Sequence, residues 1–240
     1  FFRALSGSIV AIILTMYFGF DKLKTKKPIG HLIRAFSASG CVVFYIYGIN
    51  NLMLSENIAI AHSAPIIAAF LAVPILGEKI GILRTSAILI GFIGVIIIVK
   101  PGTDLFKLES LYPLISACFM ASVYLSTRSV MSTDSSVAII FYYSFALLFT
   151  SLIFFPSNFI MPNFVQLIFA MSLGVMGSLG HFFMSQAAKY ADVAVTSPFE
   201  YSSFIFVGLM GFLIFAEVPS YSIYLGGLII ISSGIFIAYR

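Results

Sequence analysis

Two titratable side chains, Glu200 and His181, lie deep inside long hydrophobic runs of the sequence. Glu200 follows about eight residues of its run, which corresponds to roughly 12 Å along a helix. A carboxylate surrounded by hydrocarbon is costly, so it must be protonated, paired or turned toward a wet cavity. His181 lies at a similar depth in its own run. We expect the two to face each other across a cavity, where they bind a solute or carry a proton; a structural hydrogen bond is the alternative for each.

Further polar residues inside hydrophobic runs are candidate contacts for a solute. Tyr45 lies near the middle of its run, and His62 occupies a position related to Tyr201 in the internal repeat described below. Packing is the simpler interpretation of a lone histidine in such a run. Pro65 and Pro198 also lie inside runs, where proline removes a backbone hydrogen bond and kinks or breaks a helix. We expect these two positions to act as helix breaks, with a role in gating.

The remaining residues argue against catalysis and against bound cofactors. The sequence contains no HExxH, Walker or GxGxxG motif and no Ser-His-Asp order of the hydrolase kind. Its four aspartates fall in predicted loops or at a helix end, so they offer no intramembrane catalytic pair. Cys41 and Cys118 have no cysteine or histidine at metal-ligand spacing, and we interpret both as packing residues. The sequence therefore predicts a protein that is not an enzyme, with no metal or cofactor.

The amino-acid composition indicates whether water or lipid surrounds the segments that carry these residues. Hydrophobic residues make up 60% of the 240 residues and charged residues only 9%, whereas soluble domains carry about 25% charged residues. Runs such as 88–99 are apolar on every side, which suits helices in lipid and not the alternating strands of a barrel. We predict an all-α membrane protein with nine membrane-spanning helices at 1–20, 35–54, 58–76, 82–99, 111–127, 137–155, 164–188, 193–216 and 222–239.

The positions of Lys and Arg predict the orientation of these spans. With the lysine-rich loop 21–34 in the cytoplasm, ten of the 13 basic residues fall on cytoplasmic segments. Phe1 is then outside and Arg240 inside, and we expect one further helix upstream, which would give ten spans with both ends cytoplasmic. The basic pI does not predict nucleic-acid binding, because the charge is gathered in this one loop and not on a basic face.

Two stretches of the sequence resemble each other. Residues 59–96 and 198–235 each contain a long span, a glutamate at its end, a short turn and a glycine-containing span. Each helix of the second copy comes five predicted helices after its counterpart in the first, so the repeats run in opposite directions, as in many transporters whose site lies at the repeat interface. The alternative is that any two pairs of apolar helices look alike.

Several segments resemble the EamA-type proteins of the drug/metabolite transporter superfamily. They are FFRALSGSIV, LKTKKPIGHLIR, SAPIIAAFLAVPILGEKIG and GFIGVIIIVKPG in the first half, and AVTSPFEYSSFIFVGLMGFLIFAEVPS and LGGLIIISSGIFIAYR in the second. The resemblance implies two inverted five-helix repeats, here 1–100 and 111–240, with the first helix missing from this chain. It also implies transport by alternating access.

On this resemblance we expect a secondary transporter of a small organic metabolite, such as an amino acid or a related compound, in a bacterial inner membrane. Export is the family's commoner role. An importer of the S-adenosylmethionine uptake type and a nonfunctional truncated remnant are the alternatives. The expected partners are the metabolite and the lipid bilayer, with a coupling proton and a homodimer left open and no nucleic acid.

Overall fold

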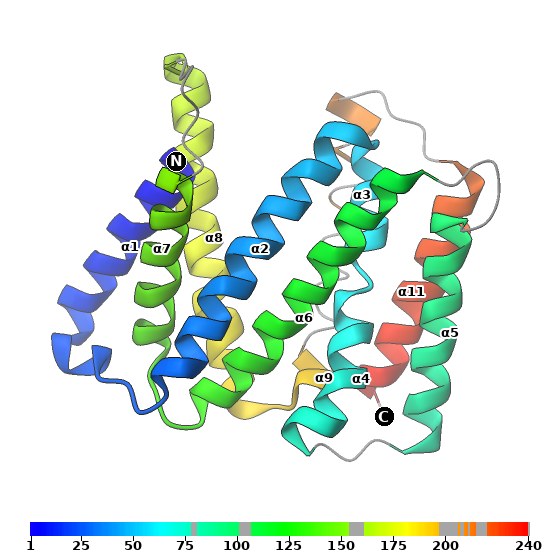
Figure 1. Ribbon diagram of the computed structural model, residues 1–240, viewed down its shortest axis with the longest axis horizontal. Helices are drawn as coiled ribbons and strands as arrows, with labels where there is room; N and C mark the ends of the chain where they lie inside the picture. The colour runs from blue at the N-terminus through cyan, green and yellow to red at the C-terminus, as the bar shows by residue number, and fades with distance from the viewer. Residues whose placement is uncertain are drawn as a thin grey trace. The chain divides into compact units, whose positions relative to one another are not determined.

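The computed structural model describes residues 1–77, 81–100, 107–153, 161–196, 206, 209–210, 212–214 and 220–239. Every regular element in these residues is a helix (Figure 1). Five helices in the described part of the chain are long and apolar enough to cross a membrane, and three shorter ones are apolar as well. The chain divides into two compact units, which are described separately.

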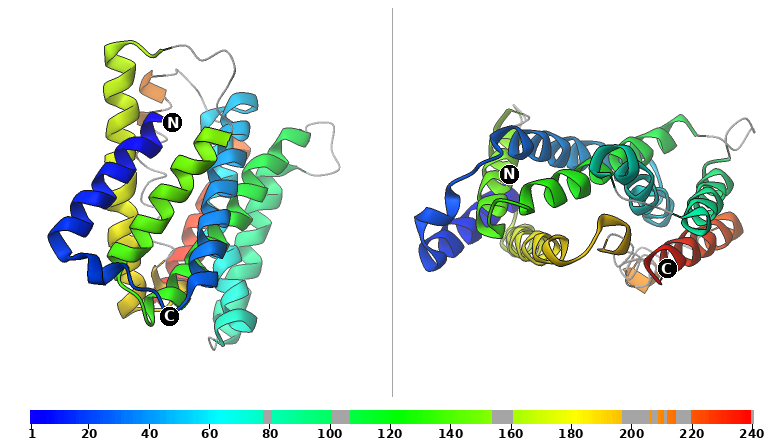
Figure 2. Two further views of the ribbon diagram at one scale, coloured as in Figure 1. Left: turned by 60° about the vertical axis from the view of Figure 1, so that its left-hand side comes forward. Right: turned by 90° about the horizontal axis from the view of Figure 1, so that it is seen from below.

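Unit 1 comprises Phe1–Ser39 and Ser126–Tyr190. Its elements are α1 (Phe2–Phe18), the 3-10 helix η1 (Phe20–Leu23), the first half of α2 (Pro28–Asn51), the end of α6 (Leu111–Met131), α7 (Ser136–Ile153) and α8 (Phe164–Tyr190). Helix α1 packs against both α7 and α8 (Figures 1 and 2). Small residues allow this close approach: Ser6 Oγ donates to Met171 O at 2.9 Å, and Ser8 Oγ donates to Ser144 O at 3.2 Å.

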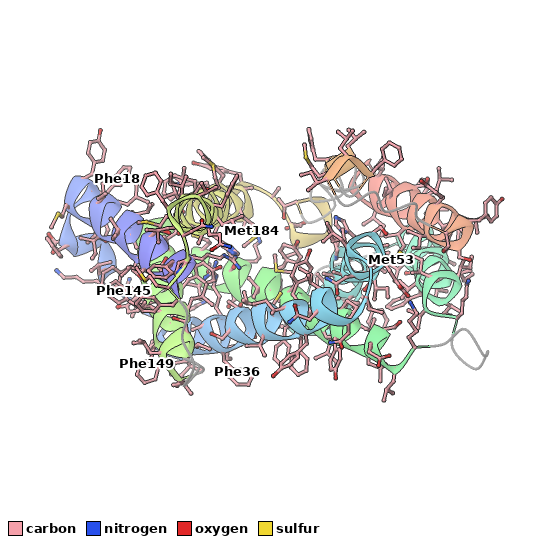
Figure 3. All side chains as sticks on the ribbon, turned by 90° about the horizontal axis from the view of Figure 1, so that it is seen from above. Phe18, Phe36, Met53, Phe145, Phe149 and Met184 are labelled. Carbon is pink, nitrogen blue, oxygen red and sulfur yellow. The ribbon has the colours of Figure 1, made fainter. Side chains whose placement is uncertain are left out.

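Large apolar side chains cover much of the surface of unit 1. Phe36 on α2 is 71% exposed and Phe149 on α7 is 66% exposed, and Figure 3 shows both pointing away from their helices. Water would penalise such a surface, whereas lipid tails do not. The helices of this unit therefore suit an apolar solvent.

Unit 2 comprises Gly40–Leu125 and Ala191–Arg240. Besides the remaining parts of α2 and α6, it holds α3 (Leu54–Ala61), α4 (Ala64–Leu76), α5 (Ile82–Val99), the 3-10 helix η2 (Leu108–Ser110), α9 (Val193–Thr196) and α11 (Tyr221–Tyr239). Helices α5 and α11 lie side by side (Figures 1 and 2). Their buried isoleucines form one apolar core with α3 and α4, and its fully enclosed members include Ile60, Ile66, Ile88, Ile230 and Ile237.

Helices α3 and α4 occupy the span predicted as one helix at 58–76, and the structure interrupts it. The amide N of Ser63 donates to Ile60 O at 3.0 Å, a three-residue step in place of the four-residue step of an α-helix. Pro65, in the first turn of α4, has no N–H to donate to Ala61 O, and its ring crowds that carbonyl. The proline therefore ends the regular hydrogen-bond ladder at His62 and Ser63.

The start of α2 also differs from the prediction. The lysines between 21 and 34 predict a loop over this whole segment, but the helix begins at Pro28. Proline is favoured at the first helical position, since its fixed φ suits a helix and its missing N–H is not needed there. Arg34 is consequently a helical residue and not a loop residue. The predicted span 193–216 lies mostly outside the described residues, so the count of nine spans stays a prediction.

A close backbone contact between helices in unit 2 joins Gly94 on α5 to Gly226 on α11. A Cβ atom on Gly226 would lie 2.6 Å from Gly94 O and 2.5 Å from Ile98 Cγ1. Because one of these atoms is backbone, the helices themselves would have to separate. We predict that Gly226→Ala lowers the free energy of unfolding by about 1–3 kcal/mol, measured by thermal unfolding in detergent.

Gly180→Ala is the matched control, since a Cβ on Gly180 meets nothing within 4 Å. Equal stabilities of the two variants would show that the α5–α11 contact is not as close as described.

Candidate functional site

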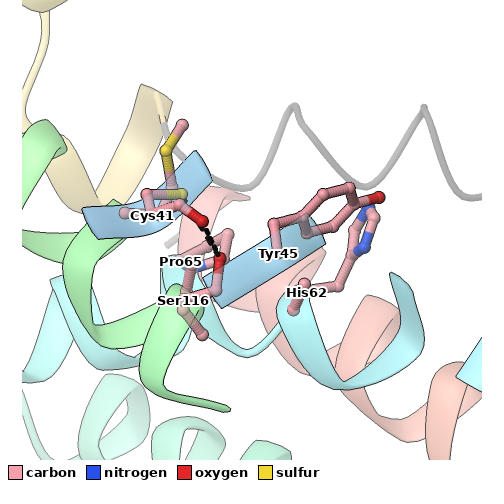
Figure 4. Close-up of a pocket in the computed structure, with 9 residues that line it drawn as sticks. Cys41, Tyr45, His62, Pro65 and Ser116 are labelled. Carbon is pink, nitrogen blue, oxygen red and sulfur yellow. Dashed lines mark hydrogen bonds between the residues drawn. The ribbon is translucent and has the colours of Figure 1, made fainter. Parts of the chain in front are cut away.

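A cavity of about 220 Å³ lies inside unit 2 where α3 breaks into α4. Its wall comes from the second half of α2, the break itself and α6, and its lining residues are Cys41, Tyr45, Ala61, His62, Ala64, Pro65, Ser116, Ala117 and Met120. Figure 4 shows the rings of Tyr45 and His62 toward one end of the group, with Cys41, Pro65 and Ser116 toward the other. The interruption of one helix thus places an irregular stretch of backbone beside a cavity, where such backbone is tolerated in membrane proteins.

Hydrogen bonds fix the polar side chains of this wall. His62 Nδ1 lies 2.7 Å from Ile58 O. A carbonyl oxygen only accepts, so Nδ1 carries the hydrogen, and Nε2 is an acceptor in the neutral ring. Ser116 Oγ donates to Cys41 O at 2.9 Å, which joins α6 to α2. The wall is therefore held in place on both sides of the cavity.

The side chains that line this cavity suit the binding of a small molecule. Its described members are alanines, a proline, two sulfur-containing side chains, a hydroxyl, a phenol and an imidazole, and none carries a fixed charge. Small-molecule sites are largely apolar with a few placed polar groups. No cluster of three His, Cys, Asp or Glu that could hold a metal occurs in the described ranges. The cavity can hold the apolar or aromatic part of a small solute.

The structure brings three of the residues singled out in the sequence to this cavity: Tyr45, His62 and Pro65. Glu200, Tyr201 and Pro198 lie outside the described residues. The hypothesis that His181 faces Glu200 therefore stays a prediction.

His181 belongs to unit 1, on α8, and takes no part in the cavity of unit 2. Its ring centroid is 4.2 Å from that of Tyr143 on α7. Arg34 from α2 contacts the same tyrosine, with Cζ 5.0 Å from the ring centroid. Unit 1 thus has a polar interior of its own.

A second polar group in unit 1 centres on Asp134, in the turn between α6 and α7. Asp134 is 8% exposed, and its carboxylate is 3.0 Å from His31 Nε2. It accepts three further hydrogen bonds, from Thr25 Oγ1, Thr133 Oγ1 and the amide N of Lys26. Burial raises the pKa of this carboxyl, but the hydrogen bonds outweigh burial and hold the pKa at about 2. The carboxylate ties the lysine-rich loop to the α6–α7 turn.

Sequence reasoning missed several of these residues. Cys41, Ser116 and Met120 are ordinary residues of apolar helices, and only the fold places them on the cavity. Arg34 was predicted in a loop because charge was used to mark loop positions. Asp134 does lie in a loop as predicted, between α6 and α7, but nothing in the sequence indicated that it is buried. A signal was present for Arg34, since Pro28 six residues earlier favours a helix start.

Comparison with known proteins identifies the family to which this chain belongs. The model of the EamA-like transporter family matches residues 1–100 and 108–239. The chain therefore belongs to the EamA-like transporter family, as its sequence segments indicated, and it is a helical, multi-pass membrane protein.

Individual relatives are transporters of several compounds. The chain is 29% identical over 239 residues to an S-adenosylmethionine uptake transporter of Rickettsia felis, covering 100% of this chain and 81% of that protein. It is 30% identical over 219 residues to a riboflavin transporter of Vibrio cholerae, covering 90% and 74%. It is 24% identical over 233 residues to the pseudopaline exporter CntI of Pseudomonas aeruginosa, covering 96% and 82%.

A solved crystal structure has the same fold. It superposes with a TM-score of 0.68 over 98% of this chain and 84% of the other, at 16% identity. At this identity the likeness concerns the fold alone.

The Asp134 group predicts a pH-dependent stability. The pKa of this carboxyl is about 2 in the folded protein against an ordinary value of 3.8. A depressed pKa stabilises the fold above the ordinary value, and the stabilisation is lost as pH falls toward the folded value. We predict that Asp134→Asn lowers the free energy of unfolding by about 2 kcal/mol at pH 6, and that the difference from wild type shrinks between pH 4 and pH 2.

Thermal unfolding across this range is the measurement. Asp21→Asn is the control, because Asp21 is exposed and paired with Lys24 on the surface. A constant difference between Asp134→Asn and wild type down to pH 2 would contradict the prediction.

Proposed function

We propose that this protein is a secondary transporter that moves a small organic metabolite across the bacterial cytoplasmic membrane by alternating access. The match to the EamA-like transporter family over nearly the whole chain carries the proposal. The cavity beside the α3–α4 break supports it, because interrupted helices in transporters are commonly associated with the binding site.

In this proposal the solute contacts Tyr45 and His62 in unit 2. Tyr45 supplies an aromatic face and a hydroxyl, and His62 supplies an imidazole held by Ile58 O. Pro65 keeps the helix broken at this point, which allows α4 to change direction relative to α3 during the cycle. Glu200 and Tyr201, with Pro198 as the matching break, have the corresponding role in the second repeat, and His181 is a further lining residue.

The proposed topology has nine spans in this chain, arranged as inverted repeats of 1–100 and 111–240. The lysine-rich loop and Arg240 lie on the cytoplasmic side. Contacts within unit 1 support this orientation: Lys27 Nζ donates to Ser129 O at 2.8 Å, and Arg128 Nη1 donates to Ala188 O at 2.5 Å. The basic segments 22–27, 128 and 189 therefore lie at one end of the unit, as cytoplasmic segments do.

We propose uptake as the direction and S-adenosylmethionine as the first solute to test. The resemblance led us to expect export, but S-adenosylmethionine uptake transporters are among the relatives that match this chain over its full length. Similarity to the pseudopaline exporter keeps export of an amino-acid-derived compound as the second candidate.

The intact protein expressed in a bacterium without a related transporter tests this function. We predict that cells take up radiolabelled S-adenosylmethionine faster than vector controls, and that Tyr45→Ala reduces the initial rate about tenfold, because an aromatic contact of about 1.4 kcal/mol is lost.

Tyr47→Ala is the matched control. Tyr47 lies two residues along the same helix, is 51% exposed and packs on Tyr112 at 5.7 Å between ring centroids, away from the cavity. Uptake equal to the vector control for S-adenosylmethionine, riboflavin and amino acids alike would refute transport by uptake. Equal losses in the two tyrosine variants would refute the cavity as the site.

A further inference from the structure

Arg34 is a buried arginine whose guanidinium is only partly engaged by unit 1. The residue is 1% exposed. Its Nε donates to Thr127 Oγ1 at 2.8 Å, and Cζ lies 5.0 Å from the centroid of the Tyr143 ring. Its Nη2 is enclosed and has no hydrogen-bond partner among the described residues. One edge of the planar group is therefore held, and another donor is unmatched.

The carboxylates of unit 1 are both engaged by other groups. The segments that form it contain two acidic residues, Asp21 and Asp134. Asp21 is exposed and lies 2.8 Å from Lys24 Nζ. Asp134 is engaged by His31 and three further donors. Both carboxylates of this unit are therefore engaged by groups other than Arg34.

A second buried nitrogen without a hydrogen-bond partner among the described residues lies near Arg34. The His181 ring packs on the Tyr143 ring at 4.2 Å, and its Nδ1 is buried with no partner in the described part of the chain. Arg34 and His181 thus contact one tyrosine from two different helices, α2 and α8. Arg34 lies six residues after Pro28, about 9 Å along α2 from its start.

A buried cation without a counter-charge is strongly unfavourable, and arginines inside membrane segments commonly mark a path for a substrate or an ion. Arginine also differs from lysine in offering several donors in a fixed plane, which suits a carboxylate while Nε stays bonded elsewhere. We propose that Arg34 binds the carboxylate of the transported solute, with Tyr143 and His181 beside it. This inference rests on the proposed function and specifies its substrate class as carboxylic acids.

In the described state Nη2 is enclosed, so the solute reaches it when the helices rearrange during the transport cycle. An anionic lipid headgroup at the surface of the unit does not reach this atom. The carboxylate of an amino acid or of an amino-acid-derived metabolite has the required chemistry. The described lining of the cavity in unit 2 offers no such cation.

Matched pairs of acids and their uncharged derivatives test this inference by binding alone. The probes are methionine with methioninamide, and S-adenosylmethionine with its methyl ester. Affinities for the purified intact protein come from the dependence of thermal stability on ligand concentration. We expect at least one acid to bind wild type about tenfold more tightly than its partner, and Arg34→Gln to abolish this preference.

Arg128→Gln is the matched control, because Arg128 carries the same charge in the same unit and already donates to Ala188 O. It should keep the tenfold preference. If Arg34→Gln does not fold, Arg34→Lys replaces it and should reduce the preference at least threefold, since an ammonium cannot reproduce the planar fork.

Three outcomes overturn the inference: no acid binding wild type more tightly than its partner, an unchanged preference in the Arg34 variants, or an equal loss in Arg128→Gln. These outcomes are separate from failure of the proposed function. A protein that moves the ester as fast as the acid remains a transporter without this carboxylate site. A protein that binds acids through Arg34 but moves no solute has the site without the transport.

Discussion

The structure of this protein depends on how polar groups are satisfied where water is scarce. In hydrocarbon, a helix closes its own backbone hydrogen bonds, and any interruption must find partners in protein or in a cavity. The chain follows this constraint over most of its described length, in helices such as α5 and α8. It departs from it at His62 and Ser63, where Pro65 removes a donor. This interruption of the helix lies beside the cavity of unit 2. Interrupted helices next to a cavity are commonly associated with the binding site in transporters, and this feature links the fold to transport.

The same constraint distinguishes the roles of the buried charged side chains in unit 1. Asp134 is buried but accepts enough hydrogen bonds to stay ionised, so it serves the structure at the end of unit 1. Arg34 is more deeply buried and has a donor without a partner in the described residues, so its structural role accounts for only part of its chemistry. A charge that is fully satisfied stabilises the fold, whereas a buried donor without a partner needs an explanation, and for Arg34 we propose the carboxylate of the solute.

Much of the fold could be predicted from the sequence because hydropathy alone decides it. The helix predicted at 82–99 is α5, Ile82–Val99, since residues 87–99 carry no polar side chain and the helix is bounded by Gly81 and Lys100. The start of α2 could not be placed by charge, because Pro28 favours a helix start despite the lysines before it. A helix break was expected at Pro65, but the position of the interruption, at His62 and Ser63, depends on the individual hydrogen bonds of these two residues.

The site was predictable only in part. Tyr45 and His62 stand out because polar groups are rare in such runs, but Cys41 and Met120 do not, and tertiary packing alone selects them. The burial of Arg34 depends on Thr127 and Tyr143, which are about 100 residues away in sequence. The repeats at 1–100 and 111–240 stay a prediction, and each compact unit of the fold takes residues from both.

Counterflow in liposomes containing the purified intact protein tests alternating access most directly. Vesicles loaded with unlabelled S-adenosylmethionine are diluted into a trace of labelled compound. The account predicts that loaded vesicles transiently accumulate label above the level reached by empty ones, because a carrier returns to the outside faster when it exchanges solute. Label entering at the same rate with and without internal solute, as through a channel, or not entering at all, would contradict it.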